Sequence, residues 1–259
     1  MSKPTFLTYE KPLLTCMVQG RTPERIKELV DVSLPEGAEA FGMQFCQMEP
    51  QYRRAEVYRE LFSYVAPLPV YVTNYRNLRK DGYNTGKNDE VLAGELLELA
   101  ACGATLCDVM GDYFDPCEGE LTVDEDAVKK QMALIDGLHQ RGAEVLMSSH
   151  VCKYTPAERV LEIAMEHQRR GADICKIVTA ASTMEEQIEN LRITELLRQQ
   201  LQIPFLFLSG GENYIARRLG GSLGNCMTLC VHEYDALATK SQPLLKDMKQ
   251  IRQLMEKKV

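Results

Sequence analysis

Residues 144–180 read EVLMSSHVCKYTPAERVLEIAMEHQRRGADICKIVTA and show the repeating unit of the fold. Two short apolar runs, residues 143–150 and 173–180, are typical of buried strands. Between them, residues 155–170 carry apolar side chains three and four positions apart, which predicts a helix. A strand, a helix and a second strand in this order form the unit from which parallel sheets are built.

The same alternation recurs along the 259 residues of the chain. The apolar runs are residues 13–18, 40–46, 69–75, 104–110, 143–150, 173–180, 204–210 and 225–231, and the segments with helical spacing are 22–33, 56–65, 89–102, 124–140, 155–170, 183–200 and 242–258. Eight strands alternating with helices predict one (β/α)8 TIM barrel domain over residues 1–259. A doubly wound open sheet is the alternative, but it favours a glycine-rich turn after the first strand, and this turn reads VQGRTP.

Local signals predict where some of these elements begin. Thr22 and Thr155 each precede a proline, which is typical of a capping hydroxyl before the first helical residue. The glycine-rich segment at 210–224, GGENYIARRLGGSLG, predicts a mobile loop and a stunted helix after the seventh strand. It lacks the GxxxxGK[ST] pattern of a nucleotide site.

Composition bounds the function. The chain is 45% apolar and 26% charged with a formal charge of -7, which is ordinary for a globular protein and argues against nucleic acid or an anionic membrane as the main partner. No apolar stretch is long enough to span a membrane, and the N-terminus MSKPTFLTYE lacks the features of a signal peptide. Nine scattered cysteines, without a CxxC pair, favour reduced thiols in the cytoplasm and disfavour a zinc site. We therefore expect no metal.

In a barrel of this kind the active site lies at the carboxyl ends of the strands, and this rule provides a list of candidates. They are Gln44, Gln47, Asn74, Arg76, Asp108, Asp112, Ser148, His150, Lys176, Thr179, Ser209, Glu212, His232 and Glu233. Gln44 and Ser148 are taken from this list as candidate substrate-binding residues.

Lys176 and His150 are the most informative of these residues. A lysine inside a buried strand is costly unless it is paired or neutralised. It is either a salt-bridged structural residue or a desolvated amine that attacks a ketone to form a Schiff base. His150 alone is typical of a residue that caps a loop. Because consecutive barrel strands are neighbours, both side chains are expected in one cavity, where an imidazole beside an iminium carbon serves as general base and acid.

Several motifs then resemble those of type I 3-dehydroquinate dehydratases, which are Schiff-base-forming barrel enzymes. MSSHVCKYTP resembles MSxHDFxxTP, ADICKIVTA resembles ADIPKIAxxPxS, and IARRLGGSLGNCMTLC resembles ISRLAGExFGSAxTFG. PVYVTNYRNLRKDG resembles PLLFTFRxxxEGG, and GAEAFGMQFC occupies the place of GADxxEWRxD. The resemblance extends from about Pro12 to the C-terminal helix and is strongest from Glu144 to Thr228.

The resemblance implies a role for particular residues. His150 matches the general acid/base and Lys176 the Schiff-base lysine. The arginine that binds the substrate carboxylate falls on Arg217, or on Arg218 if the alignment slips by one residue. Arg76 matches a substrate-contacting arginine that ends the third strand, and Gln242 matches the glutamine of a closing loop.

Other family positions differ here. The second-strand glutamate and arginine that hold substrate hydroxyls appear as Gly42 and Gln44. The glutamate that partners the catalytic histidine falls on Lys80, next to Asp81. The glutamate that ends the fourth strand is Met110, and the Asp-Phe after the histidine is Val151-Cys152. Whether Asp81, Glu212 or another carboxylate lies within hydrogen-bond reach of His150 stays open at this point. The acidic stretch at 111–127 is interpreted as a solvated loop before a helix.

The resemblance implies a lyase that dehydrates 3-dehydroquinate to 3-dehydroshikimate without a cofactor, as a cytoplasmic homodimer in the shikimate pathway of aromatic amino acid biosynthesis. Two alternatives stay open. The same imine chemistry could act on another hydroxylated keto acid, in dehydration or aldol chemistry, because the second-strand pair is missing. A non-catalytic ligand-binding module is the other alternative, because the partner glutamate is missing.

Overall fold

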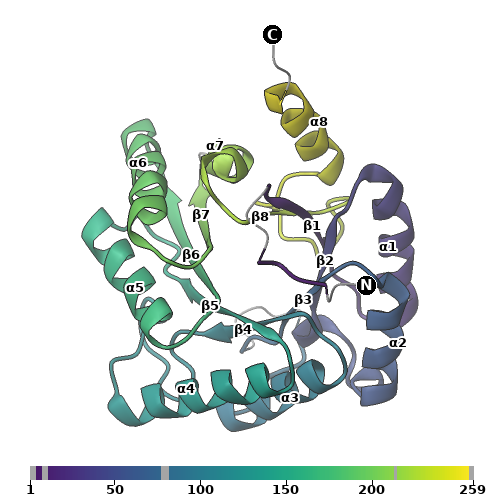
Figure 1. Cartoon of the computed structure of the whole chain (residues 1–259). Helices are drawn as coiled ribbons and strands as arrows, with labels where there is room; N and C mark the ends of the chain where they lie inside the picture. The colour runs from purple at the N-terminus through teal and green to yellow at the C-terminus, as the bar shows by residue number, and fades with distance from the viewer. Residues whose placement is uncertain (1–3, 8–10, 77–81, 213–214, 257–259) are drawn as a thin grey trace.

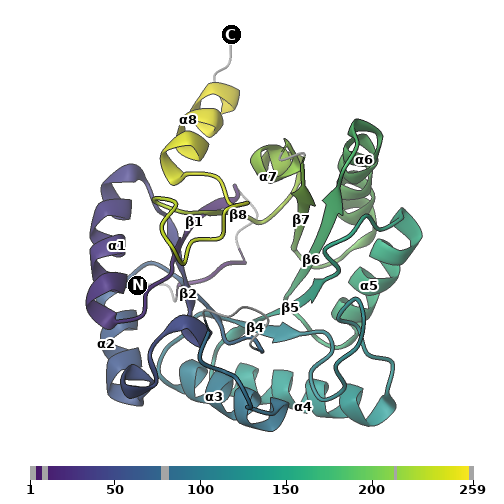
Figure 2. The same ribbon diagram turned by 180° about the vertical axis from the view of Figure 1, so that it is seen from behind.

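The structure is a computed structural model that describes residues 4–7, 11–76, 82–212 and 215–256. Its strands are β1 (Leu13–Val18), β2 (Ala40–Gln44), β3 (Val70–Thr73), β4 (Leu106–Met110), β5 (Glu144–His150), β6 (Ile174–Ala181), β7 (Phe205–Gly211) and β8 (Met227–Cys230). Its helices are α1 (Pro23–Glu36), α2 (Ala55–Val65), α3 (Asp89–Ala101), α4 (Glu125–Gln140), α5 (Ala157–Arg169), α6 (Met184–Gln200), α7 (Ile215–Leu219) and α8 (Leu245–Glu256). Figures 1 and 2 show the helices arranged around the outside of the strands.

The strands form one eight-stranded parallel sheet in the order β7-β6-β5-β4-β3-β2-β1-β8. The seam between β7 and β8 is bridged by backbone and side chain together. The Cys226 amide donates to the Phe205 carbonyl at 2.9 Å, and the Asn225 amide side chain exchanges hydrogen bonds of 2.9 and 3.0 Å with the backbone of Phe207. The sheet is thus a nearly closed barrel, which confirms the predicted (β/α)8 fold.

Side chains that alternate along each strand build two cores. Outward-facing residues pack against the helices, while the inner layers contain residues such as Ala40, Leu146 and Leu206. At the amino-terminal end of the barrel the buried Phe6 ring packs edge-to-face on Tyr71, with ring centroids 6.5 Å apart. The Phe6 amide donates to Glu144 Oε2 at 2.8 Å. Phe6 therefore packs into the amino-terminal end of the barrel, a role that the periodicity of the sequence did not indicate.

Local signals are confirmed in part. Thr22 caps α1, because its hydroxyl accepts from the Arg25 amide at 3.3 Å. The prediction for Thr155 is wrong: Pro156 occupies the N-cap of α5, and the Thr155 hydroxyl donates to the Lys153 carbonyl at 3.0 Å. The stunted helix after β7 is confirmed, since α7 has five residues. Part of the loop predicted to be mobile, residues 213–214, lies outside the described residues.

The nine cysteines are free thiols, and seven of them are buried. Among the described residues, no helix combines the length and apolarity needed to cross a lipid bilayer.

Candidate active site

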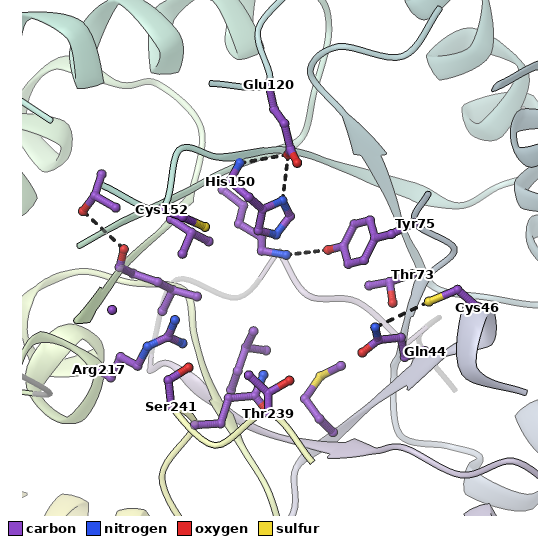
Figure 3. A pocket seen from close by; sticks show the side chains of 18 of the residues that line it. Gln44, Cys46, Thr73, Tyr75, Glu120, His150, Cys152, Arg217, Thr239 and Ser241 are labelled. Atoms are coloured by element: carbon purple, nitrogen blue, oxygen red, sulfur yellow. Dashed lines mark hydrogen bonds and ion pairs between the residues drawn. The ribbon is translucent and has the colours of Figure 1, made fainter. Parts of the chain in front are cut away.

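A cavity of about 490 Å³ opens at the carboxyl ends of the strands, where the barrel rule places the site. Its wall includes residues from seven of the strands and from the segments that follow β3, β4 and β8. Figure 3 shows Glu120, His150 and Tyr75 on one side of it and Arg217, Ser241 and Thr239 on the other. The size suits a small organic ligand.

The register of β5 and β6 brings Lys176 and His150 to this cavity. Ser148 pairs with Lys176, and His150 pairs with Val178. Since side chains alternate with a period of two, His150 and Lys176 project from the same face, one layer apart on adjacent strands. Both line the cavity, as predicted, and Lys176 is only 4% exposed.

Three polar groups surround the Lys176 amine. Nζ donates to the Tyr75 hydroxyl at 2.6 Å, to the Tyr71 hydroxyl at 3.0 Å and to Asp108 Oδ2 at 3.1 Å. Each of the three protons of an ammonium group therefore has an acceptor. The interpretation of Lys176 as a salt-bridged lysine is correct for this structure, and it is compatible with a role in chemistry because the amine also faces the cavity.

Asp108 is the charge partner of the lysine. Burial acts to raise the pKa of its carboxyl, but the charge of Lys176 and the hydroxyl of Ser148, which donates to Oδ1 at 2.6 Å, outweigh burial and leave the pKa below its ordinary value. Asp108 also accepts from the hydroxyls of Tyr71 and Tyr75. Burial, together with the charge of Asp108, holds the pKa values of both tyrosines well above the ordinary value, so both stay neutral donors.

Glu120 orients His150. Its Oε2 atom lies 2.8 Å from His150 Nδ1 and accepts the His150 backbone N–H at 2.9 Å (Figure 3). An ionised carboxylate only accepts, so Nδ1 carries the proton and Nε2 is the basic nitrogen of the neutral ring. Although burial raises the pKa of Glu120, the contacts with His150 lower it below its ordinary value. The carboxylate within hydrogen-bond reach of His150 is therefore Glu120.

The backbone around Glu120 is held in an uncommon conformation. Glu120 has φ 49° and follows Gly119 at φ 83°, and a non-glycine residue in the left-handed region costs about 1–2 kcal/mol. The Ser149 hydroxyl donates to the Glu120 carbonyl at 2.5 Å and helps to fix this turn. The interpretation of residues 111–127 as a solvated loop is wrong in part: Asp112 and Glu120 are buried, whereas residues 115–118 between them are exposed.

A buried polar network supports this loop from outside the barrel. The Arg170 guanidinium donates to the Gly111 carbonyl at 3.1 Å and to the Thr122 carbonyl at 2.6 Å. His167 Nε2 lies 3.0 Å from the Ser149 hydroxyl and is fully buried. The network thus connects α5 to the residues that flank Glu120.

His167 makes the fold sensitive to acid. Burial, followed by the charge of Arg170, lowers its pKa from 6.5 to about 3, so the folded chain does not protonate His167 while the unfolded chain does. Its contribution to stability is present above pH 6.5 and is lost as the pH falls. Between pH 7 and 5 we expect the free energy of unfolding to fall by about 2 kcal/mol from this residue. Urea titrations of the wild type and of His167→Gln should show a shallower pH dependence in the variant; equal slopes would contradict the assignment.

Strand β3 directs alternate residues to opposite sides. Tyr71, Thr73 and Tyr75 face the cavity. The Arg76 guanidinium, although it borders the cavity, donates to both carboxylate oxygens of Asp89 at 2.7 and 2.6 Å and to Asp112 Oδ1 at 2.7 Å. The contact of Arg76 with a substrate stays a prediction.

The two candidate arginines of α7 are neighbours in sequence but differ in their surroundings. Arg217 is buried, lines the cavity and donates from Nε to the Ser209 carbonyl at 3.1 Å, whereas Arg218 is exposed. Of the two, Arg217 is therefore placed to meet a ligand.

The remaining candidates lie around this centre. Gln44 and Gln242 line the cavity, and Gln44 accepts from Gln19 Nε2 at 2.7 Å. Ser148 is buried beside Lys176, with which it pairs across β5 and β6, and donates to Asp108. It is not among the described residues that line the cavity. Gly42 has Met17 packed on it: a Cβ at this position would meet Met17 Sδ at 2.1 Å. An apolar side chain thus packs against the position that the resemblance aligns with the second-strand glutamate.

Neither Asp81 nor Glu212 can be assigned as the partner of His150. Lys80 and Asp81 lie outside the described residues, and Glu212 is exposed at the end of β7. In the sequence, Glu120 stands 30 residues before His150 among several other acidic residues, and no spacing rule distinguishes it from Glu118. The one available signal was its position in the segment after β4, the strand next to β5.

With this geometry described, the chain can be compared with known proteins. Residues 47–259 match the family model described as type I 3-dehydroquinase. The 3-dehydroquinate dehydratase of Geobacillus thermodenitrificans is 34% identical over 94 residues, 36% of this chain and 37% of the relative. That of Klebsiella pneumoniae subsp. pneumoniae is 28% identical over 187 residues, 71% and 69% of the two chains. The chain spans about a third to a half of the length of the first curated relatives it matches.

Solved structures show the same fold. The 3-dehydroquinate dehydratase of Geobacillus kaustophilus gives a TM-score of 0.79 at 16% identity, with 95% of this chain and 92% of that one covered. That of Enterococcus faecalis gives 0.77 at 16% identity, with 98% and 99% covered. The barrel is thus shared well beyond the segment in which the sequences align with curated relatives. Because the family model covers most of the chain, from just after β2 through the last helix, the chain belongs to the type I 3-dehydroquinase family.

Proposed function

We propose that the chain is a lyase that dehydrates 3-dehydroquinate to 3-dehydroshikimate through an imine on Lys176. The observation that carries this proposal is the pairing of two reactive side chains in one cavity. Lys176 and His150 come from adjacent strands, and Glu120 orients the imidazole. Membership of the type I 3-dehydroquinase family supports the choice of substrate.

The reaction begins when the neutral Lys176 amine attacks the substrate ketone and water is lost. The cationic iminium nitrogen then acts as an electron sink, which acidifies the adjacent C–H group. His150 is suited to remove this proton because Glu120 occupies Nδ1 and leaves Nε2 as the base. The resulting enamine expels the β-hydroxyl, to which the protonated His150 returns the proton, and hydrolysis of the imine releases the product.

Arg217 is the proposed anchor for the substrate carboxylate. It is the buried arginine of α7 and stands across the cavity from Thr73 and Tyr75 (Figure 3). Guanidinium groups bind carboxylates through two parallel hydrogen bonds, which would fix the orientation of the ring. Gln44 and Gln242 are proposed to contact the substrate as well.

Two buried polar atoms in the cavity support a hydroxylated ligand. Thr73 Oγ1 and Gln242 Oε1 have no hydrogen-bond partner among the described residues. A buried polar atom without a partner costs about 1–3 kcal/mol, which a ligand hydroxyl would recover. Because Met17 covers Gly42 with apolar surface, the hydroxyls are expected to be recognised by these atoms rather than by second-strand charges.

Borohydride trapping tests the proposal. Wild-type protein is incubated with 3-dehydroquinate and sodium borohydride, and intact mass and peptide mapping locate the adduct. We expect an adduct on Lys176, and without borohydride a turnover of roughly 1–10³ per second. An adduct without turnover would assign the chain to another hydroxylated keto acid. The failure of every such keto acid to form an adduct would favour the non-catalytic alternative.

The cytoplasmic location, the homodimer and the place in aromatic amino acid biosynthesis are included in this proposal on the family resemblance alone.

A further inference from the structure

Tyr75 contacts the proposed nucleophile, and the mechanism above gives it no role. Its hydroxyl accepts from Lys176 Nζ at 2.6 Å and donates to Asp108 Oδ2 at 2.5 Å. Its ring packs edge-to-face on His150, with centroids 5.1 Å apart. Tyr75 therefore contacts the amine, a carboxylate and the imidazole, and Figure 3 shows it beside His150 at the cavity.

The three groups around the amine differ in their access to a substrate. Asp108 is 1% exposed and lies beneath Lys176, and Tyr71, although it lines the cavity, has no exposed surface. Tyr75 is half-buried and forms part of the cavity wall. The Tyr75 hydroxyl hydrogen bonds to the Asp108 carboxylate and also belongs to the cavity wall. A proton held by Asp108 can therefore pass through this hydroxyl to a ligand in the cavity.

Imine formation needs such a path. The ammonium group starts with three protons, and the iminium product keeps one, so two protons must leave the nitrogen and depart in the water molecule. The nitrogen must lose the first before it attacks, and the ketone oxygen must gain both before it leaves. Asp108 is the nearest base to Nζ and carries a charge in the resting pair, because its partner is the Lys176 ammonium.

We propose that Tyr75 is a catalytic proton relay which, together with Asp108, forms and breaks the Lys176 imine, leaving His150 for the proton transfers of the elimination itself. The inference rests on the proposed function, since it assumes that Lys176 attacks a ketone.

The steps balance as follows. Asp108 takes one proton from the ammonium, and the amine attacks the carbonyl carbon to give an alkoxide beside a protonated secondary amine. Tyr75 donates its proton to the alkoxide and regains one from Asp108, giving the carbinolamine. Asp108 then takes a second proton from the nitrogen. When the C–O bond breaks, that proton leaves through Tyr75 with the hydroxyl as water, and the nitrogen lone pair forms the C=N bond. Asp108 and Tyr75 end in their starting states.

Tyr75→Phe tests the relay, because it keeps the ring on His150 and removes only the hydroxyl. With 3-dehydroquinate, rapid mixing followed by borohydride should show adduct formation slowed roughly 10²-fold or more. Imine formation should then limit turnover. The isotope effect on kcat for substrate deuterated at the carbon that loses its proton should therefore fall toward unity. Tyr58→Phe is the matched control, since Tyr58 is a buried tyrosine on α2 that packs on Phe45 outside the cavity wall; its trapping rate should equal that of the wild type.

Outcomes separate the relay from the proposed function. A wild type that forms no adduct with any hydroxylated keto acid overturns the proposed function and the relay with it. A wild type that forms the adduct, with Tyr75→Phe trapping at the same rate, overturns the relay alone. If Tyr75→Phe does not fold, trapping by the wild type in D₂O decides: the relay predicts slower imine formation than in H₂O, and equal rates contradict it.

Discussion

Lys176→Met is expected to lower kcat with 3-dehydroquinate by roughly 10⁴-fold or more and to abolish the borohydride adduct, because a thioether cannot form an imine. The residual rate should show no dependence on borohydride. Steady-state kinetics with intact mass measures both effects. If the variant kept more than a small fraction of wild-type turnover, the covalent mechanism would be wrong.

The same substitution is expected to destabilise the fold. It leaves the Asp108 carboxylate buried without its cationic partner, and breaking a buried ion pair in this way costs about 3–5 kcal/mol. The loss in the free energy of unfolding is reduced because Asp108 can take up a proton and keep its contacts with Ser148 and the tyrosines. Urea unfolding at pH 7 measures the change.

Lys176→Met/Asp108→Asn is the matched variant. It removes the unpaired charge, so we expect it to recover most of the stability that Lys176→Met loses while remaining inactive. A double variant as unstable as the single one would mean that packing around the lysine, rather than the ion pair, determines the cost. In either case the loss of the adduct reports on chemistry and the urea midpoint on stability, so the two effects are read separately.

The barrel could be predicted from the sequence because eight strand-like runs alternate with helical segments, and this periodicity is set locally. The shared position of Lys176 and His150 followed from the same argument. Side chains alternate with a period of two along a strand, so two polar residues at the ends of neighbouring strands have few ways to be placed other than in the same cavity. The structure places both in the cavity, as that argument requires.

Other parts of the site depend on geometry that the sequence pattern does not carry. Glu120 reaches His150 through two successive residues with positive φ, and no rule of spacing predicts such a turn. Arg76 was aligned with a substrate-contacting arginine, yet the alternation of β3 turns Tyr75 toward Lys176. The choice between Arg217 and Arg218 required the orientation of a helix of only five residues.

Glu120→Gln is expected to lower kcat by roughly 10²–10⁴-fold while the Lys176 adduct still forms. Glu120 Oε2 makes both contacts with His150, so the variant places either its amide nitrogen or its carbonyl oxygen at this point. The nitrogen would donate to Nδ1 and favour the tautomer with the proton on Nε2, whereas the oxygen would keep both contacts without the charge that stabilises the imidazolium. Borohydride trapping and kcat, measured on the same preparation, test this separation of imine formation from proton removal.

A structural role alone would not produce the isotope effect that we expect from this variant. With proton removal slowed, the deuterium isotope effect on kcat should rise toward its full value, opposite in direction to the change expected for Tyr75→Phe. Glu118→Gln is the control, because Glu118 lies two residues away, is 85% exposed and pairs with Lys153 at the surface. It should match the wild type in kcat and isotope effect. If Glu120→Gln lost the adduct as well, Glu120 would be needed for the structure of the whole site and not only for the orientation of His150. The assignment of proton removal to the His150–Glu120 pair and of imine formation to Lys176 and its contacts would then be wrong.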